Sequence, residues 1–547
     1  MSNKDIAKLF HELSLLMELH DENPFRIRSY ENAYLIIRKL DIDLLQQSKA
    51  ELMTIKGIGE AIAEKIIEIK NTSCFQMLND FRAKTPTGVQ EMIQIKGLGP
   101  KKVKIFWKEM EVESPGELLY ACHENRLLDK KGYGVKIQND IIQSIEFLSE
   151  QKDLFLWSTL ELEVVEVLTL LRENNAGGRM ELTGAFSRAE PVLSSIEIIA
   201  DNFSENVPDG FHLVKVEEDI TELIWKNRYP IIIYKVSLEE FETKQEEQIG
   251  GSSAYMNWIH TSENIVDVVG KATKNLFIPP ECRDLEDYTN FSTDQLIEAQ
   301  DIKGVIHNHS TYSDGIYSIS DMANECIRLG YKYLVMSDHS KSAGYANGLK
   351  PDRVFEQWNE IEKLNTELSS FKIFKSIESD ILADGSLDYD DDILKQFDLV
   401  IASIHSNLKM DMNKAMIRLI KAIENPYTRI LGHPTGRLLL SRKGYPIDHK
   451  KIIDACAAND VSIELNSNPM RLDMDWKWIP YASSKGVLIS INPDAHNLRG
   501  IQDIRYGVLM ARKAGLQKNN CLNSKTLADF EQWIRSKNRI KQSLTLR

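Results

Sequence analysis

The chain has 547 residues, 42% of them hydrophobic, which is more than one core can organise, so several domains are expected. No apolar run approaches the roughly 20 residues that a membrane helix needs, and the first residues lack the apolar core of a secretory signal. We therefore expect a cytoplasmic protein that does not enter a membrane. The six cysteines include no Cys-x-x-Cys pair, which argues against a zinc finger, a redox motif and a disulfide framework.

The formal net charge of −14 does not exclude nucleic acid as a partner, because charge is distributed unevenly along the chain. Residues 1–110 carry 17 Lys and Arg against 15 Asp and Glu. The acidity lies downstream, where metal ions held by a cluster of carboxylates would neutralise part of it.

Apolar residues at helical spacing predict helices over residues 5–20 and 30–40, separated by a turn at 21–24. Two glycine hairpins follow, one with Gly57 and Gly59 before a predicted helix at 61–69, and one with Gly97 and Gly99 before a second helix. A weaker copy, Lys131-Gly-Tyr-Gly134, precedes residues 137–148. In each copy the glycines allow a positive φ in a tight hairpin, and the apolar residue between them turns back into the core.

Free backbone N–H groups at such a turn can bind a phosphate without reading any base. We interpret the repeats as helix-hairpin-helix motifs that bind the DNA backbone. The candidate contacts are Gly57, Gly59, Gly97, Gly99, Lys101 and Lys102. The alternative is that the glycines are ordinary helix caps in an all-helical interaction domain.

Two segments, Asn23-Pro-Phe-Arg-Ile-Arg-Ser-Tyr30 and Gly57-Ile-Gly-Glu-Ala-Ile-Ala-Glu-Lys65, resemble the lyase domain of family X DNA polymerases. In that family the lysine that matches Lys65 forms a Schiff base with an abasic sugar, which needs a nucleophilic amine near a bound phosphate. The resemblance makes Lys65 a candidate lyase nucleophile. The alternative is a lysine on the solvated face of an amphipathic helix.

Residues 151–290 have mixed α and β character, with a predicted helix at about 160–173 and strands at 196–200 and 231–236. By the same resemblance this region is an α+β nucleotidyltransferase-like palm. A family X palm carries a Gly-Ser turn and three aspartates that hold two magnesium ions.

The palm of this chain departs from the family pattern at every one of those positions. The Gly-Ser turn is replaced by Gly184-Ala185, two of the aspartates fall on Ser195 and Glu197, and the third falls within the apolar run 231–234. A serine and an isoleucine cannot replace carboxylates at a two-metal site. We therefore expect that polymerase activity is lost and that the palm remains as a scaffold.

From about residue 300 short apolar runs alternate with helices, as parallel α/β architecture requires. Seven runs deliver polar side chains at their C-terminal ends, where barrel enzymes build their sites, and six of the 12 histidines occupy such positions. The polar residues are His307, His309 and Asp314 after run 305–306, Asp338 and His339 after 333–336, Glu378 and Asp380 after 372–374, His405 after 399–401, His433 after 429–431, Glu464 and Asn466 after 461–463, and Asp494 and His496 after 487–491. Imidazole with carboxylate and no thiolate suits zinc, manganese or iron.

The motifs around these residues resemble the polymerase and histidinol phosphatase (PHP) domain, which implies a C-terminal α/β distorted (β/α)7 barrel with three divalent metal ions. They include His307-Asn-His-Ser-Thr-Tyr-Ser-Asp-Gly315, Ser337-Asp-His-Ser340, Ile377-Glu-Ser-Asp380, Ser403-Ile-His-Ser406, Gly432-His-Pro-Thr-Gly-Arg437 and Asn492-Pro-Asp-Ala-His496. By similarity, one metal is held by His307, His309, Glu378 and Asp494, a second by Glu378 with His405 and His433, and a third by Asp314, His339 and His496.

The order of domains resembles bacterial family X polymerases with a C-terminal PHP domain. It implies a lyase-like helical domain at 1–82, a second helix-hairpin-helix domain at 83–150, the degenerate palm at 151–290 and the PHP domain at 300–547.

The expected function is metal-dependent DNA phosphodiesterase activity in repair, with 3′–5′ exonuclease action on gapped or recessed DNA, manganese as the favoured ion, and incision of abasic DNA as a second activity. Glu378, His307 and Asp494 are the expected catalytic residues of this site, and Arg437 is an expected phosphate contact. We expect a nucleoid-associated bacterial monomer. Three alternatives stay open, namely a phosphatase of small phosphomonoesters, an active gap-filling polymerase, and a DNA-binding scaffold without catalysis.

Overall fold

The computed structural model describes residues 1–547 except residues 41, 96, 129, 131, 150–153, 176, 256–277, 289–290 and 545–547. The chain forms two compact units, one of Met1–Cys122 with Gly132–Ser149 and one of His123–Lys131 with Glu150–Arg547. The two predicted helical domains belong mostly to the first unit, and the palm and barrel belong to the second. The predicted boundaries at 150 and 290, and the lysine at 131, lie outside the described residues. None of the described helices is long and apolar enough to span a membrane.

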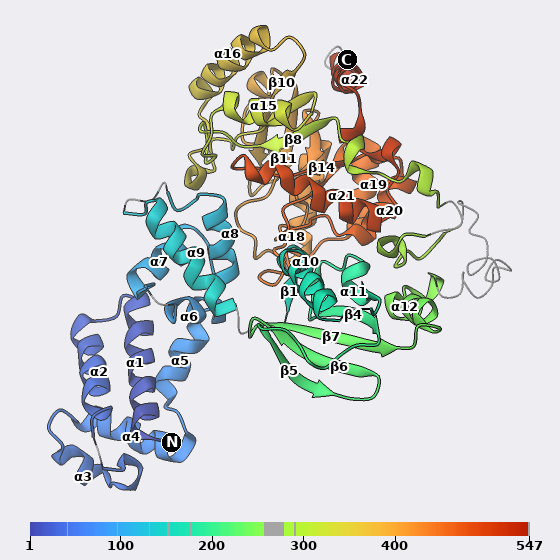
Figure 1. The fold of residues 1–547 in the computed structure, drawn as a ribbon. Helices are drawn as coiled ribbons and strands as arrows, with labels where there is room; N and C mark the ends of the chain where they lie inside the picture. The colour runs from blue at the N-terminus through green and yellow to red at the C-terminus, as the bar shows by residue number, and fades with distance from the viewer. Residues whose placement is uncertain are drawn as a thin grey trace. The chain divides into compact units, whose positions relative to one another are not determined.

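The first unit is helical, as predicted (Figure 1). Its helices are α1 (Asn3–Leu19), α2 (Pro24–Ile37), α3 (Lys49–Thr54), α4 (Glu60–Thr72), α5 (Gln76–Lys84), α6 (Thr87–Ile93), α7 (Pro100–Glu109), α8 (Pro115–His123) and α9 (Val135–Ser149). Helix α2 begins at Pro24 and not near residue 30, because the Asn23 side chain accepts a hydrogen bond from the Phe25 N–H and proline suits the first helical position.

The three glycine hairpins have one conformation, which confirms the predicted repeat. The first glycine has a positive φ in each copy, 93° at Gly57, 90° at Gly97 and 93° at Gly132. The apolar residue that follows is buried in each copy, Ile58, Leu98 and Tyr133. Helices α4 and α7 then begin directly after Gly59 and Gly99, and neither helix has a side-chain cap.

The palm is a five-stranded sheet in the order β2-β4-β7-β6-β5, in which β4 and β7 are parallel. Its elements are α10 (Trp157–Asn174), β2 (Met180–Leu182), α11 (Gly184–Ser187), β4 (Ile196–Asp201), β5 (Phe211–Val216), β6 (Ile220–Trp225), β7 (Tyr229–Val236) and α12 (Phe241–Ile249), with β1 (Phe155–Leu156) and β3 (Val192–Leu193) paired separately. The prediction includes β4 and β7 but not β5, because every residue of β5 after Phe211 is exposed and its sequence lacks apolar alternation.

The barrel consists of seven parallel strands in the order β14-β13-β12-β11-β10-β9-β8, as predicted. The strands are β8 (Gly304–Asn308), β9 (Tyr333–Met336), β10 (Lys372–Asp380), β11 (Leu399–Ser403), β12 (Thr428–Leu431), β13 (Ser462–Asn466) and β14 (Ile489–Asn492). The first and last strands nearly close the barrel through a bridge between Asn308 and Ala495, where the His309 N–H donates to the Ala495 carbonyl at 2.9 Å.

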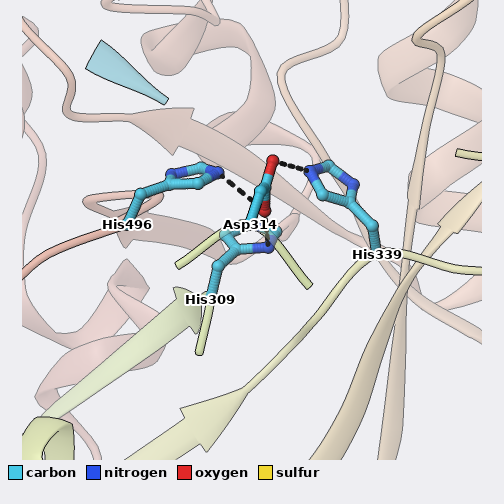
Figure 2. A group of neighbouring side chains, drawn as sticks. All are labelled: His309, Asp314, His339 and His496. Carbon is cyan, nitrogen blue, oxygen red and sulfur yellow. Dashed lines mark ion pairs between the residues drawn. The ribbon is translucent and has the colours of Figure 1, made fainter. Parts of the chain in front are cut away.

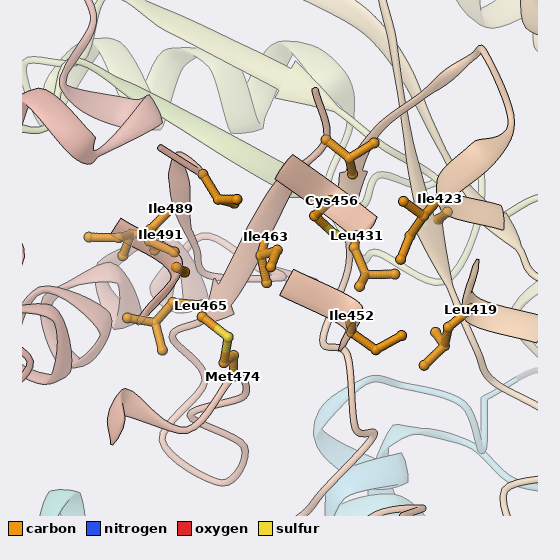
Figure 3. Close-up of a cluster of buried hydrophobic side chains, with 14 of the residues drawn as sticks. Leu419, Ile423, Leu431, Ile452, Cys456, Ile463, Leu465, Met474, Ile489 and Ile491 are labelled. Carbon is orange, nitrogen blue, oxygen red and sulfur yellow. The ribbon is translucent and has the colours of Figure 1, made fainter. Parts of the chain in front are cut away.

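Helices surround the barrel strands (Figure 1). They are α15 (Ile319–Arg328), α16 (Pro351–Glu367), α17 (Asp391–Leu394), α18 (Met412–Glu424), α19 (His449–Asn459), α20 (Ile479–Ser484), α21 (Ile504–Lys513) and α22 (Leu527–Leu544). Figure 3 shows the core between strands and helices, where Leu431 and Ile463 of the sheet lie among Leu419, Ile452 and Cys456 of α18 and α19. Strands buried on both faces read as continuous apolar runs, which is why all seven were visible in the sequence.

Replacement of Gly304 tests how tightly the first barrel strand packs. A Cβ atom at Gly304 would lie 2.0 Å from the Tyr333 ring, which is fully buried and stacked on Phe530. We expect Gly304→Ala to destabilise the second unit by about 2–3 kcal/mol, the usual cost of overpacking, and to lower its apparent unfolding midpoint by roughly 2–4 °C. Circular dichroism during heating measures this change. The matched control is Gly344→Ala, where an added Cβ meets nothing within 4 Å, and an equal midpoint for both variants would contradict the packing described here.

Candidate metal centre

The nine predicted ligands come together at the C-terminal ends of the barrel strands. His307 and Glu378 lie within β8 and β10, and the other seven follow the ends of β8, β9, β11, β12 and β14. All are buried except His405, whose side chain is 10% exposed. Parallel strands end at one face of a barrel, which is why residues almost 190 positions apart in sequence meet there.

The carboxylate of Glu378 lies at the middle of the cluster, with five imidazoles around it. Its Oε1 atom is 3.3 Å from His307 Nε2, 3.1 Å from His405 Nε2 and 2.9 Å from His433 Nε2. Its Oε2 atom is 2.9 Å from His339 Nδ1 and 3.7 Å from His309 Nε2. A carboxylate that faces ligands on both sides is suited to the bridging position predicted for Glu378.

A second carboxylate, Asp314, is surrounded by three imidazoles (Figure 2). The distances are 3.7 Å to His309 Nδ1, 3.5 Å to His339 Nε2 and 3.4 Å to His496 Nε2. His309 also lies 3.0 Å from Asp494 Oδ1 through its other nitrogen. His309 therefore faces Asp314 through one ring nitrogen. Through the other it faces Asp494, which belongs to the ligand set that the family resemblance assigns to His309.

Charges in the centre lower the pKa of the buried carboxyl groups and of His309. Burial opposes ionisation of Asp314, Glu378 and Asp494, but the neighbouring imidazoles hold the pKa of each carboxyl well below its ordinary value. Burial, together with the positive charge on two neighbouring imidazoles, lowers the pKa of His309 to about 3.

Other histidines shift in the opposite direction. Burial would lower their pKa, but neighbouring carboxylates raise the pKa of His307 well above its ordinary value and the pKa of His405 and His496 to about 9. Carboxylates and imidazoles thus stabilise each other as buried ion pairs.

The donor set fits divalent metal ions. Several buried ligand atoms have no hydrogen-bond partner among the described residues, namely His307 Nε2, Asp314 Oδ2, His339 Nδ1, Glu378 Oε2 and His496 Nε2. Buried polar atoms are rarely left without a partner unless an ion or water completes them. Three sets drawn from the nine residues have ligand atoms close enough to share an ion. The first set is His309, Asp314, His339 and His496; the second is His307, His309 and Glu378; the third is His339, Glu378 and His405. Nitrogen and oxygen ligands without sulfur suit zinc, manganese or iron.

Further polar residues hold the ligands in place. Glu464 Oε2 lies 2.6 Å from His307 Nδ1 and accepts a hydrogen bond from the Asn492 amide at 2.7 Å. Asp380 Oδ1 lies 2.5 Å from His405 Nδ1. Such carboxylates fix the orientation of a ligating imidazole through its second nitrogen. Glu464 and Asp380 follow predicted strands in the sequence, but their pairing with particular histidines needs the fold.

The sequence gives no indication of a fourth carboxylate at the centre, Glu124, which belongs to the second unit although it lies far upstream of the barrel. Its ligand atoms lie within 4.8 Å of those of Asp494 and His496. Nothing in its neighbourhood resembles a strand end.

Predicted residues outside the centre have environments of their own. Lys65 lies on α4 with its ammonium 5.6 Å from the centre of the Tyr30 ring, and Lys102 donates to the Gly97 carbonyl at 3.1 Å. In the second unit, Arg437 pairs with Asp475 at 2.6 Å and donates to the Arg471 carbonyl at 3.0 Å. Lys101 is exposed at the start of α7. Roles in lyase chemistry and phosphate binding stay predictions for these residues.

Family models match both ends of the chain. Residues 1–75 match the helix-hairpin-helix domain, and residues 306–468 match the PHP domain. The first match assigns the hairpin at Gly57 to a DNA-binding type of domain, and the second assigns the barrel to a metal-dependent one.

Individual relatives extend this picture. The chain is 31% identical over 580 aligned residues to the DNA polymerase/3′-5′ exonuclease PolX of Bacillus subtilis, an alignment that covers 98% of this chain and 100% of the relative. It is also 26% identical to a probable phosphatase of Thermoanaerobacter sp. (strain X514) and 27% identical to one of Caldanaerobacter subterraneus, over 43% and 35% of this chain and 94% and 74% of the relatives. The helical region, the palm and the barrel are therefore shared with one relative in full. The chain belongs to the bacterial family X DNA polymerases that carry a C-terminal PHP domain.

Proposed function

We propose that this protein is a DNA phosphodiesterase of repair that removes nucleotides from 3′ ends at the barrel centre. The observation that carries the proposal is the convergence of all nine predicted ligands in one buried cluster around Glu378. The Bacillus subtilis relative bears the name of a 3′-5′ exonuclease, and its alignment extends over the helix-hairpin-helix region. Gapped, recessed and abasic DNA are the proposed substrates.

The nine ligands would hold up to three divalent ions, with Glu378 between two of them and Asp314, His339 and His496 around the third. Such ions supply an activated water near neutral pH and polarise a phosphoryl oxygen. The protein's own contribution is to position the ligands. Glu464 holds the ring of His307 in a fixed orientation, and Asp380 does the same for His405. Arg471, which is 5% exposed beside the cluster, is placed to neutralise a bound phosphate.

A phosphatase of small phosphomonoesters is the main rival, because probable phosphatases share the barrel. They match 43% and 35% of this chain, whereas the alignment with the PolX relative covers 98% of it. Backbone N–H groups at the start of α4 and α7 carry no side-chain cap, so they can bind DNA phosphates. The hairpins therefore favour DNA over a small ester.

Loss of polymerase activity is supported by the surroundings of Glu197. Its carboxylate accepts a hydrogen bond from the Ala185 N–H at 3.1 Å and another from the Tyr234 hydroxyl at 3.1 Å. Glu197 lies opposite Ile232 in the β4 and β7 register, and Tyr234 is the next residue on the same face. The turn that matches the Gly-Ser motif is thus filled by an internal carboxylate, and the adjacent strand offers no carboxylate partner for a two-metal site.

Two further activities at abasic sites belong to the proposal. Incision of the DNA strand would use the barrel centre, and Schiff-base chemistry would use Lys65, which lies one turn beyond the first hairpin with its ammonium over Tyr30. Borohydride trapping on abasic DNA would report the second activity independently of the barrel.

Removal of one ligand tests the nuclease. We expect His307→Ala to lower the rate of 3′ digestion of a labelled recessed strand in manganese by more than ~10²-fold, and Glu464→Gln to lower it by roughly 10–100-fold, because Glu464 only positions His307. Glu367→Gln, an exposed carboxylate at the end of α16, should have the wild-type rate. If the wild type cleaves a nitrophenyl phosphate but leaves DNA intact, the phosphatase rival is correct.

The titration of the histidines predicts how metal affinity depends on pH. Protonated His405 and His496 stabilise the metal-free fold below the ordinary histidine pKa, and this contribution is lost as the pH rises through about 9. Metal ions need these rings without their protons, so binding strengthens over the same range. We expect manganese to raise the unfolding midpoint more at about pH 8.5 than at about pH 6.5, as measured by scanning calorimetry under nitrogen. An equal or smaller rise at the higher pH would contradict the ion pairs described above.

Polymerase activity is tested most cleanly in a variant that cannot degrade its own product. We expect His307→Ala to add no nucleotide to a one-nucleotide gap with all four deoxynucleotides and manganese, because the palm lacks the carboxylates that hold two ions. A template-dependent polymerase of another family, run on the same DNA, is the positive control. Incorporation by His307→Ala that disappears in the double variant with Glu197→Ala would establish an active palm.

A further inference from the structure

A short segment that links two helices of the first unit belongs to the second unit. Residues His123–Lys131 connect α8 to α9, yet they group with the barrel and not with those helices. Within this segment Glu124 is 7% exposed and Leu127 is fully buried. The segment is therefore packed into the second unit and does not extend into solvent.

The side chain of Glu124 reaches the metal centre. Its carboxylate lies within 4.8 Å of ligand atoms of Asp494 and His496, and its Oε1 atom is 4.0 Å from Arg471 Nη2. His496 Nε2 is buried and has no hydrogen-bond partner among the described residues. Glu124 thus lies close to both the expected metal ligand His496 and the Arg471 guanidinium.

Charge makes this position unusual for a carboxylate. Asp314, Glu378 and Asp494 already supply negative charge to the same cluster, and Arg471 lies beyond hydrogen-bond distance of Glu124. A buried carboxylate without a close partner is unfavourable unless a cation completes it. An ion held beside His496 would complete it, with the carboxylate oxygen as an additional ligand. A phosphoryl oxygen of a substrate has the same charge and the same affinity for metal and arginine, so it would compete for this place.

The residues next to Glu124 contact an aromatic ring and a backbone carbonyl of the barrel part. The Arg126 guanidinium lies over the Tyr345 ring at 4.2 Å, and its Nε atom is buried with no hydrogen-bond partner among the described residues. The Asn125 amide donates to the Asp314 carbonyl at 3.5 Å, the outer limit of a hydrogen bond. Neither contact belongs to the strand pairing of the barrel, so the segment can leave its position without disrupting the strand ends that carry the nine ligands.

We propose that Glu124 is a displaceable internal ligand of the phosphoesterase centre, which holds the place of a substrate phosphoryl group until a phosphate displaces it. Residues 123–128 then act as a plug, and the substrate class that removes it is an oxygen-rich phosphate. The inference rests on the proposed function only in that the centre binds phosphate. It holds for a nuclease and for a phosphatase.

Phosphate binding tests the plug without any assay of turnover. The probe is inorganic phosphate, titrated calorimetrically into the full-length protein loaded with manganese. If the plug fills the site about nine-tenths of the time, its removal strengthens apparent affinity roughly tenfold. We expect that change in Glu124→Ala and in Glu124→Gln, which keeps the side-chain shape. Arg126→Ala, which touches no ligand, should shift affinity in the same direction by a smaller factor. Glu367→Gln is the matched control and should bind phosphate as the wild type does.

Metal content and DNA digestion distinguish a displaceable Glu124 from a permanent metal ligand. The plug predicts that Glu124→Gln retains its manganese after dialysis, by elemental analysis, and digests a short oligonucleotide several-fold faster at low substrate concentration. Loss of manganese with weaker phosphate binding would make Glu124 a permanent ligand and overturn the proposal, as would unchanged phosphate affinity. If no variant digests DNA but phosphate binding strengthens as described, the nuclease proposal fails and the plug stands.

Discussion

The buried carboxylate of Glu378, faced by five imidazoles, is the interaction on which the rest of the barrel depends. An isolated buried carboxylate costs several kcal/mol, so the position is tolerable only because cationic rings or metal ions surround it. Parallel strands whose C-terminal ends share one face provide that surrounding. The backbone is strained to achieve it, since His307 and Asp494 have φ of 65° and 53° in the left-handed region. Non-glycine residues adopt that conformation mainly where surrounding structure enforces it, as at functional sites.

The candidate ligands can be proposed from the sequence because each lies at or just after the end of an apolar run. A strand buried on both faces is a continuous hydrophobic segment, so its end is easy to recognise, and a histidine or carboxylate there stands out. The partners that orient the ligands are harder to predict. Glu464 is visible as a polar residue on β13, but its contact with His307 joins strands β8 and β13 and depends on barrel closure. Strand β5 and the start of α2 were missed for local reasons, an exposed face in one case and an asparagine cap in the other.

Glu124 shows where such reasoning stops. Glu124 follows helix α8 in a helical part of the sequence. No sequence pattern links it to the barrel strands, which begin about 180 residues later. Only the contacts of residues 124–126 with Asp314, Tyr345 and Arg471 bring it to the centre. A site residue on a segment between two helices has no sequence pattern that marks it. A site residue at a strand end is marked by the apolar run that precedes it.

The palm and the barrel show that the residues which pack a fold differ from the residues which form its reaction site. The palm core packs α10 against β4 and β7 through residues such as Leu160, Ile198 and Ile231, none of which touches chemistry. The positions compared with the family's aspartates are Ser195, Glu197 and the apolar run 231–234, and Glu197 accepts a hydrogen bond from Tyr234. The core of the sheet does not depend on these positions. The barrel is the reverse case, since the PHP domain is matched by a family model and probable phosphatases match less than half of the chain. A shared set of ligands cannot choose between a small ester and a DNA end. The choice must come from groups around the ligands, and in this chain those groups include the carboxylate of Glu124, which lies between helices α8 and α9 in the sequence.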